Sequence, residues 1–302
     1  MQNKGILLVL STTIISGVSI FVNQYGVKVV NPYIFTGLKN VVVAVLLLGI
    51  ILLLKEFNNI KQLNIRNWLW LAIIGLVGGS VPFLMFFKGL SLSTGPEASY
   101  IHKFMFVIIA ILAPIFLKEK VKWHYLMGLG FLFFGSILLF KINSGFSLSN
   151  GNLLIIGATF LWAIENVISK HAINNKISPL IVAWGRMGFG SLFIVLFWVF
   201  SNQLSSLATI NVGQISWVYL TAVLLFGYVI SWYVGLKYIP LTYAVAILAL
   251  GAPITSLLQL MQGQALTGNQ FWGVGFMFSG VILFIVIDRI LCLRSKQPVG
   301  IQ

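Results

Sequence analysis

Charged side chains stand out inside apolar stretches of this sequence, where they are costly. Lys39, Lys103 and Arg186 are three such cations, and Glu165 is an acid in a similar setting. A charge at mid-bilayer depth costs about 2.5 kcal/mol or more, so it normally has a partner or faces a watery cavity. A cation could hold a carboxylate or a phosphate there, and a carboxyl group could carry a proton. These residues therefore indicate a polar site within a membrane.

The apolar stretch around Glu165 carries a polar stripe. At 100° per residue, one third of the helix circumference holds most of its polar side chains and one aromatic. These are Thr159, Trp162, Glu165, Asn166 and Ser169. We expect the stripe to line a cavity and to bind a small solute, with Trp162 stacking on the apolar part of that solute. The alternative is an interface between helices held by polar side chains.

A second stripe runs along the first apolar stretch. Thr12, Ser16, Ser19 and Asn23 share one face there. Ser16, Ser19 and Asn23 stand 146 positions before Trp162, Glu165 and Ser169 in the sequence. We expect the two stripes to face a common space.

Lys39 and Arg186 each follow a proline, Pro32 or Pro179, by seven residues. Either cation could hold the anionic group of a solute. Alternatively, Arg186 pairs with Glu165, and the long side chain of Lys39 reaches the headgroups.

The apolar stretch after Gly95 begins with charged residues. Thr94 and Glu97 fit a capping box, in which each side chain bonds to the backbone of the other residue. His102 and Lys103 lie on a different face, where Lys103 could line the mouth of a cavity. Glu165, Glu97 and His102 are the candidates for proton coupling, because their side chains can bind a proton.

Composition defines the class of protein that must position these groups. Of the 302 residues, 59% are hydrophobic and 8% are charged, which predicts a polytopic membrane protein rather than a soluble one. The net charge of +14 resides in scattered loops, so we expect no nucleic-acid partner. A single cysteine and the absence of a phosphate-binding loop predict no metal site, no cofactor and no ATPase.

The first apolar stretch lacks a cleavage signal and is expected to remain as a span. Ten spans are predicted at roughly 5–25, 33–54, 67–90, 96–117, 122–141, 151–172, 179–200, 214–236, 241–262 and 270–291.

Basic residues fix the predicted orientation. With ten spans, one side receives thirteen of the nineteen basic residues, whereas the other receives Lys28, Lys88 and Lys141. Cytoplasmic loops are rich in lysine and arginine, so both termini are expected in the cytoplasm of a multi-pass protein of the cell membrane.

The sequence also repeats itself. Gly5 aligns with Gly151, Pro32 with Pro179, Gly89 with Gly235 and Gly135 with Gly280, at offsets between 145 and 147. Two five-span halves, residues 1–145 and 146–302, are therefore expected. Because each half has an odd number of spans, the second must be inverted relative to the first. Inverted repeats are common in secondary transporters.

These features together resemble the EamA family of the drug/metabolite transporter superfamily. The resemblance rests on the two halves, on Lys39 and Arg186 early in the second span of each half, and on the end of each half. The run 114–121 precedes Gly128 and Gly135, and the run 263–267 precedes Gly273 and Gly280. The family usually has a glutamate before the last span of both halves, and here the two residues are Glu119 and Gln264. The resemblance implies a basket of ten helices around a central cavity that exports amino acids, other small metabolites or amphipathic cations.

We therefore expect an all-α secondary transporter, not an enzyme, that moves a small organic metabolite by alternating access. Three intramembrane cations favour an amino acid or an organic acid as substrate. The alternative within transport is efflux of amphipathic drugs or quaternary amines. Alternatives of another class are a membrane-embedded enzyme, a scramblase and a non-transporting scaffold. The lipid bilayer is the expected surrounding, a monomer is compatible with the sequence, and the coupling ion stays open.

Overall fold

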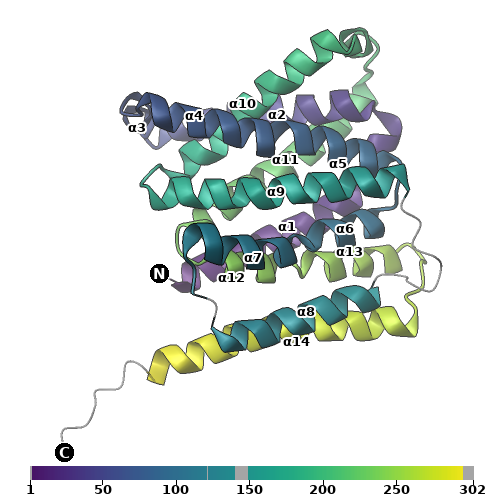
Figure 1. Cartoon of the computed structure of the whole chain (residues 1–302). Helices are drawn as coiled ribbons and strands as arrows, with labels where there is room; N and C mark the ends of the chain where they lie inside the picture. Colours follow the sequence, from purple (N-terminus) through teal and green to yellow (C-terminus); the bar gives the residue numbers. More distant parts are fainter. Residues whose placement is uncertain (1, 121, 140–148, 295–302) are drawn as a thin grey trace, which may run out of the picture.

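The computed structural model (Figure 1) describes residues 2–120, 122–139 and 149–294. Lys141, Lys296 and the predicted boundary between residues 145 and 146 lie outside these residues, as do the side chains of Arg289 and Arg294. All regular elements in the described part are helical. In chain order they are α1 (Gln2–Val29), α2 (Pro32–Leu53), α3 (Phe57–Lys61), α4 (Ile65–Ile74), η1 (Gly75–Ser80), α5 (Val81–Ser91), α6 (Gly95–Lys103), α7 (Met105–Leu117), α8 (Trp123–Leu139), α9 (Asn150–Asn174), α10 (Pro179–Phe200), η3 (Gln203–Leu207), α11 (Val212–Leu236), α12 (Leu241–Leu248), α13 (Gly251–Leu260) and α14 (Gly268–Arg294).

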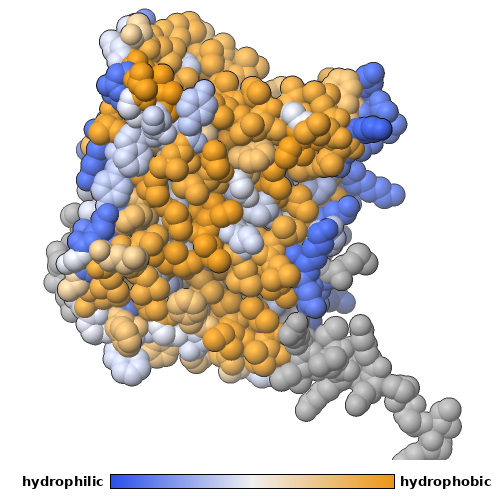
Figure 2. Space-filling model, turned by 180° about the vertical axis from the view of Figure 1, so that it is seen from behind, coloured by the Kyte–Doolittle hydropathy of each residue, from blue (hydrophilic) through white to orange (hydrophobic). Residues whose placement is uncertain are grey.

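The helices confirm a polytopic membrane protein. Within the described residues, nine helical segments are long and apolar enough to cross a membrane, and α8 is a shorter apolar helix. Large apolar side chains such as Leu7, Phe200 and Phe271 are more than 60% exposed, which suits a surface that faces lipid. Figure 2 shows this surface as a broad hydrophobic band, with hydrophilic residues gathered at the ends.

Three of the predicted spans are interrupted. The third consists of α4, the π-helix η1 and α5, which follow one another without a loop. The fourth breaks at Phe104, between α6 and α7, and the ninth breaks between Leu248 and Gly251. Glycine at 78, 79 and 251 allows close helix contacts at or beside two of these breaks. Interrupted spans of this kind are tolerated where the protein interior supports the freed backbone groups.

Helix contacts follow the repeat and cross between the halves. Helix α1 packs on α11, and its counterpart α9 packs on α5. Each pair meets at two glycines, Gly5 with Gly235 and Gly151 with Gly89, where side-chain or backbone atoms of the partner helix or of the residues that follow it leave no room for a larger residue. Helices α8 and α14, also counterparts, pack mainly on each other and form the lowest layer in Figure 1. The interior is thus shared by both halves.

Glu119 caps the N-terminus of α12. Its carboxylate accepts hydrogen bonds from Leu241 N at 2.6 Å, from Thr242 N at 3.0 Å and from Thr242 Oγ1 at 2.8 Å. A carboxylate at a helix N-terminus satisfies amide groups that have no partner within the helix and complements the helix dipole. This glutamate of the first half therefore positions a helix of the second half.

Candidate central cavity

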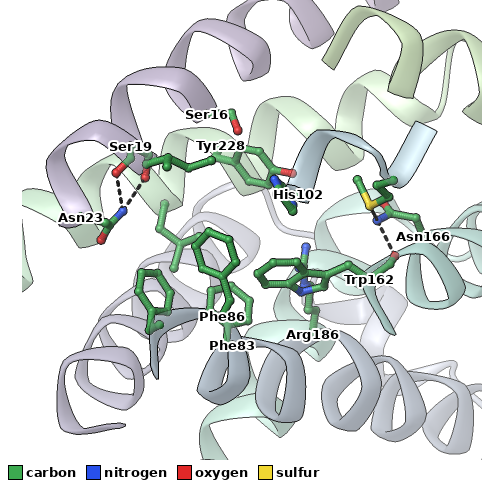
Figure 3. Close-up of a pocket in the computed structure, with 14 residues that line it drawn as sticks. Ser16, Ser19, Asn23, Phe83, Phe86, His102, Trp162, Asn166, Arg186 and Tyr228 are labelled. Atoms are coloured by element: carbon green, nitrogen blue, oxygen red, sulfur yellow. Dashed lines mark hydrogen bonds between the residues drawn. The ribbon is translucent and has the colours of Figure 1, made fainter. Parts of the chain in front are cut away.

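A cavity of about 60 Å³ lies in the middle of the helices. It is large enough for several water molecules. Both halves contribute, because its wall comes from α1, α5, α6, α7, α9, α10 and α11 (Figure 3). The lining residues are Ser16, Ser19, Ile20, Asn23, Phe83, Phe86, Phe87, His102, Met105, Trp162, Asn166, Arg186, Leu225 and Tyr228.

The polar stripe of α1 forms one side of the cavity. Ser16, Ser19 and Asn23 follow each other at spacings of three and four residues, so that they share one face of the helix. Asn23 donates through Nδ2 to Ser19 Oγ at 2.9 Å and to the Ser19 carbonyl at 2.6 Å. These bonds leave the Oδ1 atom of Asn23 to accept from another donor, which is Lys39.

Trp162 and Asn166, one turn apart on α9, form the opposite side. Trp162 Nε1 donates to the carbonyl of Gly78 at 2.9 Å. Asn166 Nδ2 donates to the Trp162 carbonyl at 2.7 Å, and its Oδ1 accepts from Trp232 Nε1 at 2.7 Å. Both side chains are therefore fixed by their partners, which is the property that a binding site requires.

Arg186 is the charged group of the wall. Its Nε donates to the Gly78 carbonyl at 3.2 Å and its Nη1 donates to Tyr233 Oη at 3.4 Å. Its guanidinium carbon lies 5.4 Å from the ring centroid of Phe83. Nη1 is 3.9 Å from Glu165 Oε2. Within the described part of the chain, no hydrogen bond uses Nη2.

Glu165 lies behind the wall and is fully buried. Its Oε1 accepts from Ser169 Oγ and from Tyr233 Oη, both at 2.5 Å. Its Oε2 has no hydrogen-bond partner within the described residues and has Arg186 as its nearest cation. This arrangement confirms the ion pair between Arg186 and Glu165 that the sequence left as an alternative. A buried charge pair of this kind would be strongly disturbed by removal of either partner.

The π-helix η1 supplies the acceptor that positions both Trp162 and Arg186. In a π-helix the backbone bonds run to the fifth residue, and such turns are frequent at functional sites. Gly78 also contacts the Glu165 side chain directly, because a methyl group at position 78 would lie 2.2 Å from Glu165 Cγ. The glycines of η1 thus allow α9 and α10 to approach the third span closely.

Lys39 and Lys103 are buried one layer behind the wall. Lys39 Nζ donates to Asn23 Oδ1 at 2.7 Å and lies 3.9 Å from the ring centroid of Phe87. The alternative in which Lys39 reaches the headgroups is therefore wrong. Lys103 Nζ donates to Ser16 Oγ at 2.6 Å and lies 3.4 Å from His102 Nδ1. Each lysine thus contacts a residue of the lining without being part of it.

Comparison with known proteins identifies the family to which the chain belongs. The model of the EamA-like transporter family matches residues 3–141 and 149–286. The chain belongs to this family. The uncharacterized transporter YyaM of Bacillus subtilis is 25% identical over 306 residues, which cover 98% of each chain. The uncharacterized transporter YetK of the same organism is 23% identical over 94% of this chain and 85% of its own length. The family and these relatives identify a multi-pass membrane transporter.

A crystal structure of another protein has the same fold. It superposes with a TM-score of 0.73 over 95% of this chain and 98% of the other, at 17% sequence identity. At this identity the likeness concerns the fold alone. The cavity therefore has to be interpreted from its own residues.

The structure brings most of the predicted site residues to one place. Seven of them line the cavity: Ser16, Ser19, Asn23, His102, Trp162, Asn166 and Arg186. Glu165, Ser169, Lys39 and Lys103 lie behind the wall and bond to lining residues or to one another. Glu97 lies apart, because it forms the capping box with Thr94 at the start of α6.

The sequence did not reveal the aromatic part of the wall. Phe83, Phe86 and Phe87 come from α5, and Tyr228 comes from α11. The ring of Trp162 lies 5.3 Å from Phe83 and 5.2 Å from Phe86, measured between ring centroids. The spacing of the three phenylalanines places them on one helix face, which is the signal that could have found them.

Proposed function

We propose that the protein is a secondary transporter that moves a small organic anion or zwitterion, an amino acid or an organic acid, through the central cavity. The observation that carries this proposal is Arg186, a guanidinium in the cavity wall whose Nη2 has no hydrogen bond in the described part of the chain. A guanidinium can bind a carboxylate through two parallel hydrogen bonds. The carboxylate of the solute would therefore bind at Arg186.

The charges around the cavity support an anionic group on the solute. Lys39 and Lys103 lie one layer behind the wall, whereas Glu165 is the carboxylate nearest to Arg186 and is already held by two hydroxyl groups. Cations thus outnumber carboxylates around the site among the described residues. A carboxylate in the cavity would balance this excess in a region where unpaired charge is costly.

Equivalent contacts at the two ends of the molecule support alternating access as the transport mechanism. Asn31 Nδ2 donates to Gln203 Oε1 at 3.0 Å at one end, and Ser178 Oγ donates to Glu56 Oε2 at the other. The members of the two pairs are related by the same offset of 147 residues. Each pair connects one half to the other. Breaking one pair while keeping the other would open the cavity to one side at a time.

Proton linkage would involve Glu165. A solute carboxylate that bound to Arg186 would compete with Glu165 for the guanidinium. Protonation of Glu165 would remove that competition, so that solute and proton would bind together. His102 lines the cavity, and its Nδ1 lies beside the Lys103 ammonium, so His102 is the second candidate for this role.

We place the protein in the cell membrane with both termini in the cytoplasm, as the distribution of lysine and arginine favours. We propose no catalytic activity, because the relatives are named as transporters. The molecule's substrate would then leave the cavity unchanged.

Uptake into proteoliposomes tests the proposal. Radiolabelled amino acids, organic acids and one quaternary amine would be offered to wild type, with and without a pH gradient. Arg186→Ala and Lys28→Ala each remove one cation, from the cavity and from an exposed helix end respectively. We expect saturable uptake of a carboxylate solute that Arg186→Ala abolishes and Lys28→Ala preserves. Failure of every solute to accumulate above protein-free vesicles would contradict the proposal.

A second candidate is efflux of a quaternary amine, and the aromatic wall is the observation that favours it. Phe83, Phe86, Phe87, Trp162 and Tyr228 surround the cavity, and aromatic rings attract cations. The same assay separates the two candidates. Uptake of the amine alone, lost in Glu165→Gln and kept in Arg186→Ala, would establish the second candidate and exclude the first.

A further inference from the structure

A second pocket lies at the end of the molecule that holds α3 and the N-terminus of α1. It measures about 640 Å³ and is bounded by α3, the start of α4, the link between α9 and α10, and the end of α11. We refer to it as the α3 pocket. The side chains in its lining that can form hydrogen bonds are Lys176, Lys237, Asn59, Gln62, Asn67, Asn175, Glu56, Ser178 and Tyr238. None of them contributes to the central cavity, so the α3 pocket is a separate site.

Donor groups dominate the α3 pocket. The ammonium groups of Lys176 and Lys237 form no hydrogen bond or ion pair in the described part of the chain, although the backbone N–H of each residue donates within its own turn. The carboxylate in the lining, Glu56, already accepts a hydrogen bond from Ser178. Two free ammonium groups beside side-chain amides suit an oxyanion, and lysine commonly binds phosphate as a point charge.

The opposite end of the molecule shows that the fold does not require this pocket. Gln214 donates through Nε2 to the Val29 carbonyl there, at 2.6 Å, which closes the seam between the halves. The equivalent residues, 147 positions away in each case, are Asn67 and Lys176. Both line the α3 pocket, and no hydrogen bond joins them. The pocket thus occupies the place of a contact that the other end makes.

Lysines occupy unusual backbone positions at the same end. Lys55, Lys118 and Lys176 have positive φ values of 58°, 54° and 69°. The repeat counterparts of Lys55 and Lys118 are Asn202 and Gly263, the residue types that adopt this conformation most readily. Lysine is therefore present at this end despite a conformational cost, and Lys176 is the one of the three that lines the α3 pocket.

The α3 pocket adjoins the surface that faces lipid. Leu54 lines the pocket and is 60% exposed, and the preceding Leu53 is 82% exposed. The pocket lies where the spans end, at the depth of the lipid headgroups. Basic pockets at this level between transmembrane helices bind the phosphate groups of anionic lipids. We propose that the α3 pocket binds the phosphate of one anionic lipid headgroup through Lys176 and Lys237.

Native mass spectrometry of the full chain in detergent tests this proposal. The protein would be titrated with phosphatidylglycerol, with phosphatidylcholine and with glycerol 3-phosphate. We expect one tightly bound phosphatidylglycerol, weakened about tenfold or more in the double variant Lys176→Gln/Lys237→Gln. The matched double variant Lys118→Gln/Lys120→Gln removes two charges at the link between α7 and α8 and should change the affinity by less than about twofold. Size-exclusion profiles would verify that both variants are folded.

Three results would overturn the proposal. Equal weakening in both double variants would mean a diffuse attraction by net charge. Equal affinity for phosphatidylcholine would mean that anionic charge is not recognised. Competition by glycerol 3-phosphate at the lipid's own concentration would assign the pocket to a soluble phosphate ester. Because this test measures lipid binding, its outcome is independent of solute transport through the central cavity.

Discussion

The third span of the first half and its counterpart α11 differ by one residue. Asn64 and Asn211 cap the two spans in the same way and are 147 positions apart, whereas Gly89 and Gly235, near their other ends, are 146 apart. The first half therefore has one extra residue between these points. Helix α11 is regular from Val212 to Leu236, and the third span contains the π-helix η1. A π-helix is the usual way in which a helix accommodates one additional residue.

This difference gives the duplicated halves different roles at the cavity. Helix α11 contributes side chains, Leu225 and Tyr228, whereas η1 contributes the Gly78 carbonyl that holds Trp162 and Arg186. The two equivalent cations differ in the same way, since Arg186 lines the cavity and Lys39 lies behind Asn23. The comparison teaches that the one-residue difference in the third span accompanies an asymmetric cavity, to which the two halves contribute different groups.

The largest expected effect comes from closing the space in η1. In Gly79→Ala the new methyl group would lie 1.8 Å from the Arg186 carbonyl oxygen, so α10 would have to move away. We expect the melting temperature in detergent to fall by about 5 °C or more, because overpacking destabilises by ~1–3 kcal/mol or more. Gly49→Ala is the control, since no atom lies within 4 Å of the new methyl group. Equal melting temperatures for the two variants would show that η1 does not pack closely on α10.

Removal of the extra residue should have the next largest effect. Deletion of Val77 would let the third span become a regular helix like α11 without changing the direction of its ends. The Gly78 carbonyl would then accept a hydrogen bond from the backbone of its own helix. Both Trp162 and Arg186 would lose this acceptor. We expect solute uptake to fall at least about tenfold, as loss of two hydrogen bonds of ~1 kcal/mol each implies. Helix content from circular dichroism should stay the same. Unchanged uptake would show that the π-helix does not position the residues of the cavity wall.

A smaller effect is expected from Trp162→Phe. This change keeps an aromatic ring against Phe83 and Phe86 but removes the donor to the Gly78 carbonyl. One neutral hydrogen bond contributes ~1 kcal/mol, so KM for the solute should rise about fivefold. Trp232→Phe serves as the comparison, because its donor bonds to Asn166 instead. A KM for Trp162→Phe equal to that of wild type would mean that this bond does not position the ring.

Hydropathy and repeat matching were sufficient to predict most of the fold. Apolar run length predicted the spans, and the offsets near 146 predicted which segments of the two halves are counterparts. The packing of α1 on α11 and of α9 on α5 was seen only in the structure. The break at Phe104 was missed because no glycine or proline marks it in the sequence. The π-helix η1 was missed because apolar sequence looks the same in α-helix and π-helix. The signal available in the sequence was the change of the repeat offset from 147 to 146 across Gly75–Ser80. It becomes visible only when Asn64 is aligned with Asn211 and Gly89 with Gly235.

Helical periodicity predicted the polar stripes but not their exact orientation. Trp162 and Asn166 face the cavity, whereas Glu165 and Ser169, on the same third of the helix, turn towards Tyr233. The contacts of α9 with its neighbours decide this rotation, and they are invisible in one sequence. The choice for Lys39 between the cavity and the headgroups stayed open for a related reason, because its partners Asn23 and Phe87 lie on other helices.

The most direct test of the central claim compares the two equivalent cations in one uptake assay. Arg186→Gln and Lys39→Gln would be measured beside wild type with the carboxylate solute that proteoliposomes accumulate. Because only Arg186 lines the cavity, we predict that Arg186→Gln abolishes saturable uptake and that Lys39→Gln keeps KM within about threefold, a change of less than ~1 kcal/mol in binding. Saturable uptake by Arg186→Gln with an unchanged KM would contradict the account.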